Sequence, residues 1–512
     1  MSFFILYQSI RDQNLLNSRR FGRFIICELL ISGRSPRFLL QWYKLTEVGV
    51  LGDGLGQSKQ HWNSTNHKPC MVSQSASSAV TAIIMLCGLA LNWLKKFHVD
   101  IHGHKRDLKD TFIKTPLVDG LGDEDDGLLW ERDPEKHRRV SKAMSPAFSG
   151  NSLRSKLPTM NKHIDLMVKM IGQHGVVDIS SWLEWLCMDT AADLAWGWEM
   201  HQVRDMKSHG FLEAMEAGNF LVVILAAAKT YPFLYPLALM FAPWKVMRSL
   251  PRMISEAKVQ VVHRIKRRYD LKHSDYFEQL LPADRPSPTN DKQISHMLTV
   301  AGQLILGGYD PTSVAIYMGF YFLLRNPTAL KQVRQEVREN FQQYEDIEAE
   351  ALRALPFLNA CLQETLRLSA AATHHSLPRI SPGAMVNKEY ISKGVICRNS
   401  LFAYGRSVRF FHNSKDFRLE RWLPESHPSY DPKFSTDQRD AHYPFIMGPR
   451  QCPGREVARH MFRLVIAKVL WSYDVEQLSK PLDFDRDFRV YSMWVKPELR
   501  ICFTPAKGQG AM

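Results

Sequence analysis

One ten-residue segment near the C-terminal end constrains the fold of this chain more than any other. Residues 445–454 read Phe-Ile-Met-Gly-Pro-Arg-Gln-Cys-Pro-Gly, so a single cysteine follows a turn that contains glycine. Apolar residues then recur at helical spacing over residues 455–471, which predicts an amphipathic helix directly after the cysteine. The fold must therefore place one cysteine at the start of a helix, with a glycine on either side of it.

A cysteine in this position can serve as a metal ligand. A thiolate ligates iron in some haem enzymes, and the unpaired N–H groups of a helix N-terminus favour the thiolate form of Cys452. Gly448 and Gly454 let the backbone approach a flat macrocycle, and Arg450 could reach a haem propionate. A lone cysteine is more often a small buried residue near a turn. The complete pattern F-x-x-G-x-R-x-C-x-G, which begins at Phe445, favours the ligand.

This segment resembles the haem-binding loop of cytochrome P450, the haem-thiolate monooxygenase family. The order of further motifs extends the resemblance over about residues 107–503, in the manner of a microsomal fungal member. It implies a mainly α fold with a small β region, the cytochrome P450 fold. It also implies haem b (iron protoporphyrin IX) as the cofactor, with an axial thiolate from Cys452. Phe445, Gly448 and Gly454 would contact the haem, and Arg450 and Arg379 would bind its propionates.

The rest of the pattern is dominated by helix. Helical periodicity predicts helices over residues 130–144, 178–198, 294–325, 330–341, 355–368 and 455–471. Residues 220–244 are apolar but contain three prolines, so two short helices joined by a loop are expected there, either as a pocket roof that dips into a membrane or as an ordinary core pair. Short strands are expected between residues 385 and 402, and a last strand over residues 500–503. One large, mainly α domain over residues 105–512 follows from this pattern.

Glu364 and Arg367 stand three positions apart on one predicted helix. Such a pair is usually a solvated surface contact that contributes little to stability. In the cytochrome P450 family, however, Glu-x-x-Arg and a later arginine form a buried ion cluster that fixes the loop beneath the haem. Arg421 matches that later arginine, whereas Leu419 stands where the family usually has a proline. The resemblance therefore assigns a structural role to Glu364, Arg367 and Arg421.

The long predicted helix contains Gly-Gly-Tyr-Asp-Pro-Thr, which resembles the family pattern small-Gly-x-acid-Thr-Thr. In the family, the small residues make room for dioxygen and the acid feeds protons inward. The resemblance thus assigns Gly307 and Gly308 to the cofactor and oxygen pocket, and Asp310 and Thr312 to catalysis. Pro311 stands where the catalytically important threonine belongs, so proton delivery needs Thr312, ordered water or a substrate hydroxyl.

Two other features depart from the family pattern. The family motif Trp-x-x-x-Arg, whose arginine binds a propionate, is replaced by a segment from His137 to Ser141, so that contact is expected to be weakened or moved to Arg138 or Lys142. The stretch between Leu94 and His137 is also shorter than the family normally has. The N-terminal part of the catalytic domain is therefore expected to be shortened.

The first hundred residues suggest a membrane attachment. Residues 1–75 contain no repeat, signal peptide or recognisable motif and stay unassigned. Residues 76–94 carry no charge, are just long enough to span a bilayer, and precede Lys95 and Lys96. A buried core helix is the alternative to this possible transmembrane anchor. The anchor predicts an endoplasmic reticulum membrane protein whose catalytic domain faces the cytosol.

The formal net charge of +14 invites a partner. Basic residues concentrate around the cysteine and its helix, and in the resembled family this face docks an acidic electron-transfer protein, here NADPH-cytochrome P450 reductase. A basic surface without a specific role is equally compatible, and nothing in the pattern indicates nucleic-acid binding. The eight cysteines form no C-x-x-C motif, so neither a zinc site nor a disulfide framework is expected.

The resemblance implies an enzyme that inserts one oxygen atom from O2 into a small apolar organic substrate, with electrons from the reductase. Fungal members commonly act in secondary-metabolite biosynthesis. Two alternatives stay open at this point. One is a haem-thiolate enzyme that uses peroxide, or that isomerises or dehydrates its substrate. The other is the non-catalytic product of a damaged gene.

Overall fold

The computed structural model describes residues 98–105, 110–116, 127–230, 244–270, 273–371, 378–398 and 400–507. Its main helices are α5 (Pro134–Met144), α6 (Gly150–His174), α7 (Ile179–Trp196), α9 (Gly210–Thr230), α11 (Trp244–Lys266), α13 (Asp291–Arg325), α14 (Pro327–Asn340), α15 (Pro356–Leu368) and α17 (Arg455–Ser472). The expected mainly α fold is confirmed. In this part of the chain, no helix has both the length and the apolar character that a bilayer crossing requires. The unassigned residues 1–75 and the possible anchor 76–94 lie outside the described residues.

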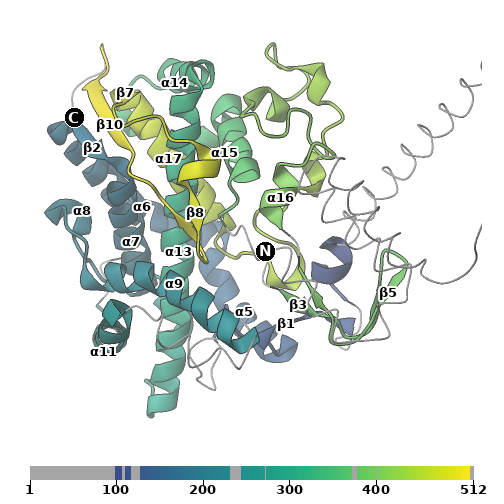
Figure 1. Ribbon diagram of the computed structural model, residues 1–512. Helices are drawn as coiled ribbons and strands as arrows, with labels where there is room; N and C mark the ends of the chain where they lie inside the picture. The colour runs from purple at the N-terminus through teal and green to yellow at the C-terminus, as the bar shows by residue number, and fades with distance from the viewer. Residues whose placement is uncertain are drawn as a thin grey trace, which may run out of the picture.

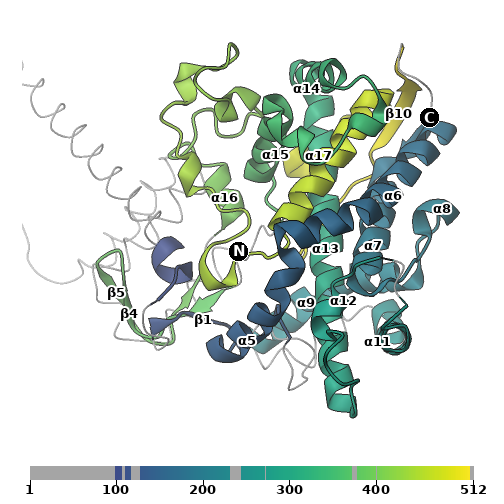
Figure 2. The same ribbon diagram turned by 180° about the vertical axis from the view of Figure 1, so that it is seen from behind.

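Helix α13 runs through the middle of the helical region (Figures 1 and 2). It starts at a strong cap, where the Asn290 side chain accepts a hydrogen bond from the Gln293 N–H at 3.0 Å. Its most extensive contact is with α7, and it also packs against α17, α15 and α11. Most side chains of α7 are buried, which explains why the sequence of that helix is apolar on all sides. These two helices form the centre of one continuous hydrophobic core.

Within the described residues, ten short strands form two small sheets and two hairpins. One antiparallel sheet joins β1 (Ile113–Lys114), β3 (Arg379–Ile380) and β6 (Ile396–Cys397), and the other joins β2 (Val176–Asp178), β10 (Arg500–Pro505) and β7 (Tyr473–Gln477). The hairpins are β4 (Ala384–Val386) with β5 (Glu389–Ile391), and β8 (Arg489–Val490) with β9 (Trp494–Val495). The two sheets lie on opposite sides of the helical region (Figures 1 and 2). The small β region expected between residues 385 and 402 and the final strand are confirmed.

In the apolar segment at residues 220–244, α9 continues without a break to Thr230, and α11 starts at Trp244. Residues 231–243 lie outside the described residues, so the two short helices expected here stay a prediction. The three prolines that suggested broken helices all lie between these two elements, so α9 ends before the first of them. Glu216 and Asn219, on α9, belong to a polar cluster described below.

Candidate haem site

Cys452 lies directly before α17, as the sequence predicts. Its N–H donates to the Phe445 carbonyl at 3.0 Å, which closes the loop over the turn Gly448–Arg450. Gly448 has φ +74°, and a Cβ on it would lie 2.0 Å from the His102 carbonyl oxygen. Only glycine fits there, because the loop packs against the backbone near residue 102. At Gly454, by contrast, a Cβ would meet no atom of the described chain within 4 Å.

The thiol of Cys452 is accessible from outside the protein. The residue is exposed, yet the surrounding atoms raise the pKa of its thiol by desolvation. The Gly454 N–H and the Arg455 charge lower that pKa, which is the expected helix N-terminal effect, but they do not outweigh desolvation. A metal ion that binds such a sulfur deprotonates it outright. An accessible sulfur at the start of a helix therefore suits an axial thiolate ligand.

Cations gather at this loop: Arg450 belongs to the loop itself, and two buried cations come from strands β3 and β1. Arg379 on β3 is 2% exposed, and within the described chain neither of its terminal nitrogens has a hydrogen-bond partner. Arg450 donates to the Glu131 carbonyl at 2.6 Å, and burial lowers its pKa to about 10. Burial, and then the charge of Arg450, lower the pKa of Arg379 to about 9. Lys114 on β1 is the strand neighbour of Arg379 and is also buried. Such a group calls for an anion, and two haem propionates fit it.

His137 lies close to the same cations. Its side chain is buried, and burial followed by the charges of Arg450, Lys114 and Arg379 lowers its pKa to about 3. Arg138 and Lys142 are both exposed. The expectation that the propionate contact is weakened, or moved to one of these two residues, stays a prediction. His137 shares its helix face with the buried Met144, and this periodicity is the sequence signal that could have identified it.

The predicted oxygen-pocket residues lie in the middle of α13. Gly307 is exposed and a Cβ on it would meet no described atom within 4 Å, whereas a Cβ on Gly308 would lie 3.2 Å from the Ala191 Cβ. Pro311 follows Gly307 by one helical turn and is half-buried, while Thr312 is 5% exposed. Pro311 cannot donate to the Gly307 carbonyl, so the helical hydrogen-bond ladder is interrupted on the face that Gly307 leaves open.

Asp310 points into a polar cluster that sequence reasoning missed. Its carboxylate accepts from Asn219 Nδ2 at 2.9 Å and lies 3.7 Å from Lys496 Nζ. Lys496 also pairs with Glu184 at 2.8 Å. Burial raises the pKa of Asp310, although Lys496 and Asn219 oppose this effect. Burial thus disfavours the ionised form of this carboxyl group.

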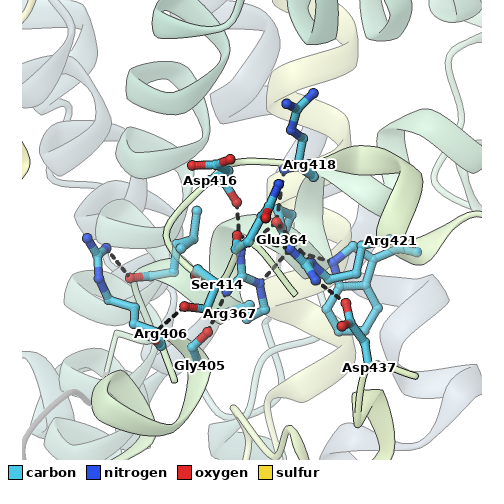
Figure 3. Close-up of polar contacts among 12 residues, drawn as sticks. Glu364, Arg367, Gly405, Arg406, Ser414, Asp416, Arg418, Arg421 and Asp437 are labelled. Carbon is cyan, nitrogen blue, oxygen red and sulfur yellow. Dashed lines mark hydrogen bonds and ion pairs between the residues drawn. The ribbon is translucent and has the colours of Figure 1, made fainter. Parts of the chain in front are cut away.

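Glu364, Arg367 and Arg421 meet as predicted, in a fully buried cluster (Figure 3). Arg367 makes two 2.7 Å hydrogen bonds to the two Glu364 oxygens, and Arg421 Nε donates to Glu364 at 3.3 Å. Burial alone would raise the pKa of Glu364, but the two arginines hold that pKa below its ordinary value. Sequence reasoning missed Asp437, which pairs with Arg421 Nη1. Both arginines also donate to backbone carbonyls of residues 405–416, so the cluster holds that loop against α15.

The basic face predicted around α17 is smaller than the sequence suggests. Arg463 and Lys468 are buried, where they contact Asn359 at 2.8 Å and Asp165 at 2.5 Å. Arg455 and Arg459 stay half-exposed and both pair with Glu456. The solvent-accessible basic residues of this helix are therefore confined to its first turns.

Comparison with known proteins agrees with this geometry. The family model described as "Cytochrome P450" matches residues 96–503. The cytochrome P450 monooxygenase TwmD of Talaromyces wortmannii is 40% identical over 411 residues, which cover 79% of this chain and 80% of that protein. The averantin hydroxylase of Dothistroma septosporum is 27% identical over 379 residues, 72% of this chain and 70% of that protein. The crystal structure of the cytochrome P450DA heme domain superposes with a TM-score of 0.63 at 17% identity, over 77% of this chain and 84% of that one.

Proposed function

This chain belongs to the cytochrome P450 family, and from that premise we propose that it inserts one oxygen atom from O2 into a small apolar organic molecule with electrons from NADPH-cytochrome P450 reductase. Its curated relatives are cytochrome P450 monooxygenases of fungi, so it is an oxidoreductase of that kind. The relative named averantin hydroxylase supports a role in fungal secondary metabolism. The substrate we propose is an apolar product of such a pathway.

The observation that carries this proposal is the pairing of an exposed thiol with a buried arginine, Arg379, whose terminal nitrogens have no hydrogen-bond partner within the described chain. Cys452 presents sulfur at the start of α17, and Arg450 adds a second guanidinium group from the same loop. Haem fits this pairing, because its iron needs an axial ligand and its two anionic propionates need cationic partners. When it is bound, a thiolate-ligated haem iron supplies the activation of dioxygen. The chain contributes the ligand, the propionate contacts and the acid Asp310.

The first test is spectroscopic. We expect the purified, haem-containing protein to show a red-shifted Soret band in its reduced carbon-monoxide complex, and we expect Cys452→Ala to lose that band. Cys502→Ala is the matched control, because Cys502 is half-exposed on β10 and should leave the spectrum unchanged. Nitrogen ligation, or a protein that binds no haem, would refute the assignment. The same measurement tests the alternative of a non-catalytic gene product.

The second test concerns the reaction. The expressed protein, with reductase, NADPH and a crude fungal metabolite extract, should yield a product heavier by one oxygen atom, and no product without NADPH. The position of Pro311 favours one alternative, a haem-thiolate enzyme that uses peroxide or that isomerises or dehydrates its substrate. Product formation without NADPH or reductase would support that alternative instead.

We further propose that the protein is attached to the endoplasmic reticulum membrane through residues 76–94, with its catalytic domain facing the cytosol. The uncharged run and the following lysines support this placement. Expression of the full chain and of a variant without residues 1–95, followed by membrane fractionation, tests it. Recovery of the full chain in the soluble fraction would contradict the proposal.

A further inference from the structure

Three charged side chains from three elements meet beside Asp310. Lys496, which follows β9, contacts Glu184 of α7 at 2.8 Å and Asp310 of α13 at 3.7 Å. On α9, Glu216 is hydrogen-bonded to Glu184 and accepts from the Tyr309 hydroxyl at 3.4 Å. We call Glu184, Glu216, Asp310 and Lys496 the distal cluster.

The distal cluster holds more acid than base. Three carboxyl groups surround one ammonium group, so full ionisation would leave a net charge of −2. Glu216 is an exposed residue, yet the protein atoms around its carboxyl group, followed by the charge of Glu184 and a hydrogen bond to it, raise the pKa of Glu216 to about 8. The pKa of Lys496 is raised as well: burial lowers it, but Glu184 and Asp310 outweigh burial. Glu216 therefore favours its protonated form near neutral pH, while Lys496 stays charged.

Exposure decreases along the cluster toward Asp310. Glu216 is an exposed residue of α9, and the Glu184 side chain is 20% exposed. The side chains of Lys496 and Asp310 are 4% and 2% exposed. Protons from solvent thus reach the two glutamates first, and the lysine lies between them and the aspartate. The titratable groups that face Glu216 are Glu184 from α7, Tyr309 and Asp310 from α13, and Lys496 from the segment after β9.

We propose that Glu216 and Glu184 store a proton and that Lys496 passes it to Asp310. The distal cluster thereby supports proton delivery by Asp310 without the threonine hydroxyl that the family has at the position of Pro311. Lys496 gives one N–H proton to the Asp310 carboxylate and takes one from the Glu184–Glu216 pair. The ammonium group is thereby restored, and the pair recovers its proton from solvent at Glu216. Only protons move. Glu184, Glu216 and Lys496 are positioning residues that act through Asp310, and this inference rests on the proposed function.

The stored proton can be tested without substrate. Because the folded protein favours neutral Glu216, its contribution to stability is present at low pH and is lost as pH rises through about 8. The melting temperature of the wild type, relative to Glu216→Gln, should therefore fall between about pH 6 and about pH 9. Glu213→Gln, one turn earlier on α9 and exposed, is the matched control and should follow the wild type at every pH. A difference between wild type and Glu216→Gln that stays constant with pH would overturn the proposal.

The transfer to Asp310 is tested in the NADPH-coupled assay. The product formed per NADPH should decline above about pH 8 in the wild type, whereas in Glu216→Gln it should be low and independent of pH. Lys496→Met should lower that ratio by at least about tenfold at all pH values, and Lys496→Arg should lower it less. If all variants retain the carbon-monoxide band and the wild-type pH profile, the relay is wrong and the proposed function stands. If the wild type itself lacks the band, the proposed function fails first.

Discussion

Two ionic clusters of this fold, the Glu364–Arg367–Arg421 cluster and the distal cluster, differ in charge balance and in exposure. The proximal cluster consists of Glu364, Asp437, Arg367 and Arg421, with two acids, two bases and side chains that are at most 1% exposed. The distal cluster has three acids, one base and two members that reach solvent. The proximal cluster also donates to several backbone carbonyls (Figure 3).

This difference separates a structural cluster from one that exchanges protons. In the proximal cluster, the arginines hold the pKa of Glu364 low, so its charge state does not change over the physiological range. In the distal cluster, burial raises the pKa of both Glu216 and Asp310. A balanced cluster that is closed to solvent fixes a loop, whereas an unbalanced cluster that solvent reaches can hold a mobile proton.

The largest effect is expected from Arg421→Met. The variant leaves Asp437 buried without its counter-ion and removes one of the two bases on Glu364, so it should cost about 3–5 kcal/mol. Chemical denaturation and the yield of haem-loaded protein measure this loss. Arg418→Met is the control, since its side chain is exposed and only its N–H contacts Glu364. If the two variants are equally stable, the proximal cluster does not have the structural role assigned to it.

Lys496→Met should cost less, about 1–3 kcal/mol at about pH 8. Its acidic partners can take up protons once the lysine is gone. Because Lys496 lowers the pKa of Asp310, loss of the lysine should raise that pKa, so the destabilisation should grow as pH rises and shrink toward about pH 6. Thermal denaturation against pH measures this, with Lys496→Arg as the control that keeps the charge. If the loss of stability does not depend on pH, the distal cluster does not exchange protons, and the two clusters do not differ in this respect.

Two substitutions, Pro311→Thr and Pro311→Ala, test whether proton delivery by the distal cluster needs a hydroxyl beside Asp310. Both restore the N–H donor toward Gly307 and should stabilise α13 by up to about 3 kcal/mol, the cost of proline inside a regular helix. Only threonine adds a hydroxyl beside Asp310. We expect threonine to raise the product formed per NADPH several-fold over alanine. Equal ratios would show that the distal cluster delivers protons without any hydroxyl at this position.

The sequence alone predicted the proximal side well, because its signals are local. Cys452 and its loop lie within ten residues, and Glu364 and Arg367 lie within one helical turn. The helix after the cysteine starts at Arg455, as its periodicity indicates. Sequence analysis did not identify Asp437, because no fixed spacing connects an aspartate in an irregular loop to Arg421.

The sequence also did not predict the distal cluster, because its members are even farther apart along the chain. Lys496 and Glu184 lie at distant points of the chain, and only the packing of the segment after β9 on α7 brings them together. One local signal existed. Trp494 is buried, and residues two apart on an extended chain share a face, so Lys496 could be expected to point inward. Nothing in the sequence shows which acid it meets.

The smallest effect is expected from Asn219→Ala, which removes the hydrogen bond from Nδ2 to Asp310. Asn219 is half-buried, so water can partly replace it, and the loss should be about 1 kcal/mol at about pH 8. The hydrogen bond lowers the pKa of Asp310, so the loss should fade as acid protonates that carboxyl. Asn219→Asp adds a fourth carboxyl of the same shape and should cost more, with a difference that increases with pH. If both variants lose the same stability at every pH, the excess of acid over base has no energetic consequence, and the distinction between the two clusters fails.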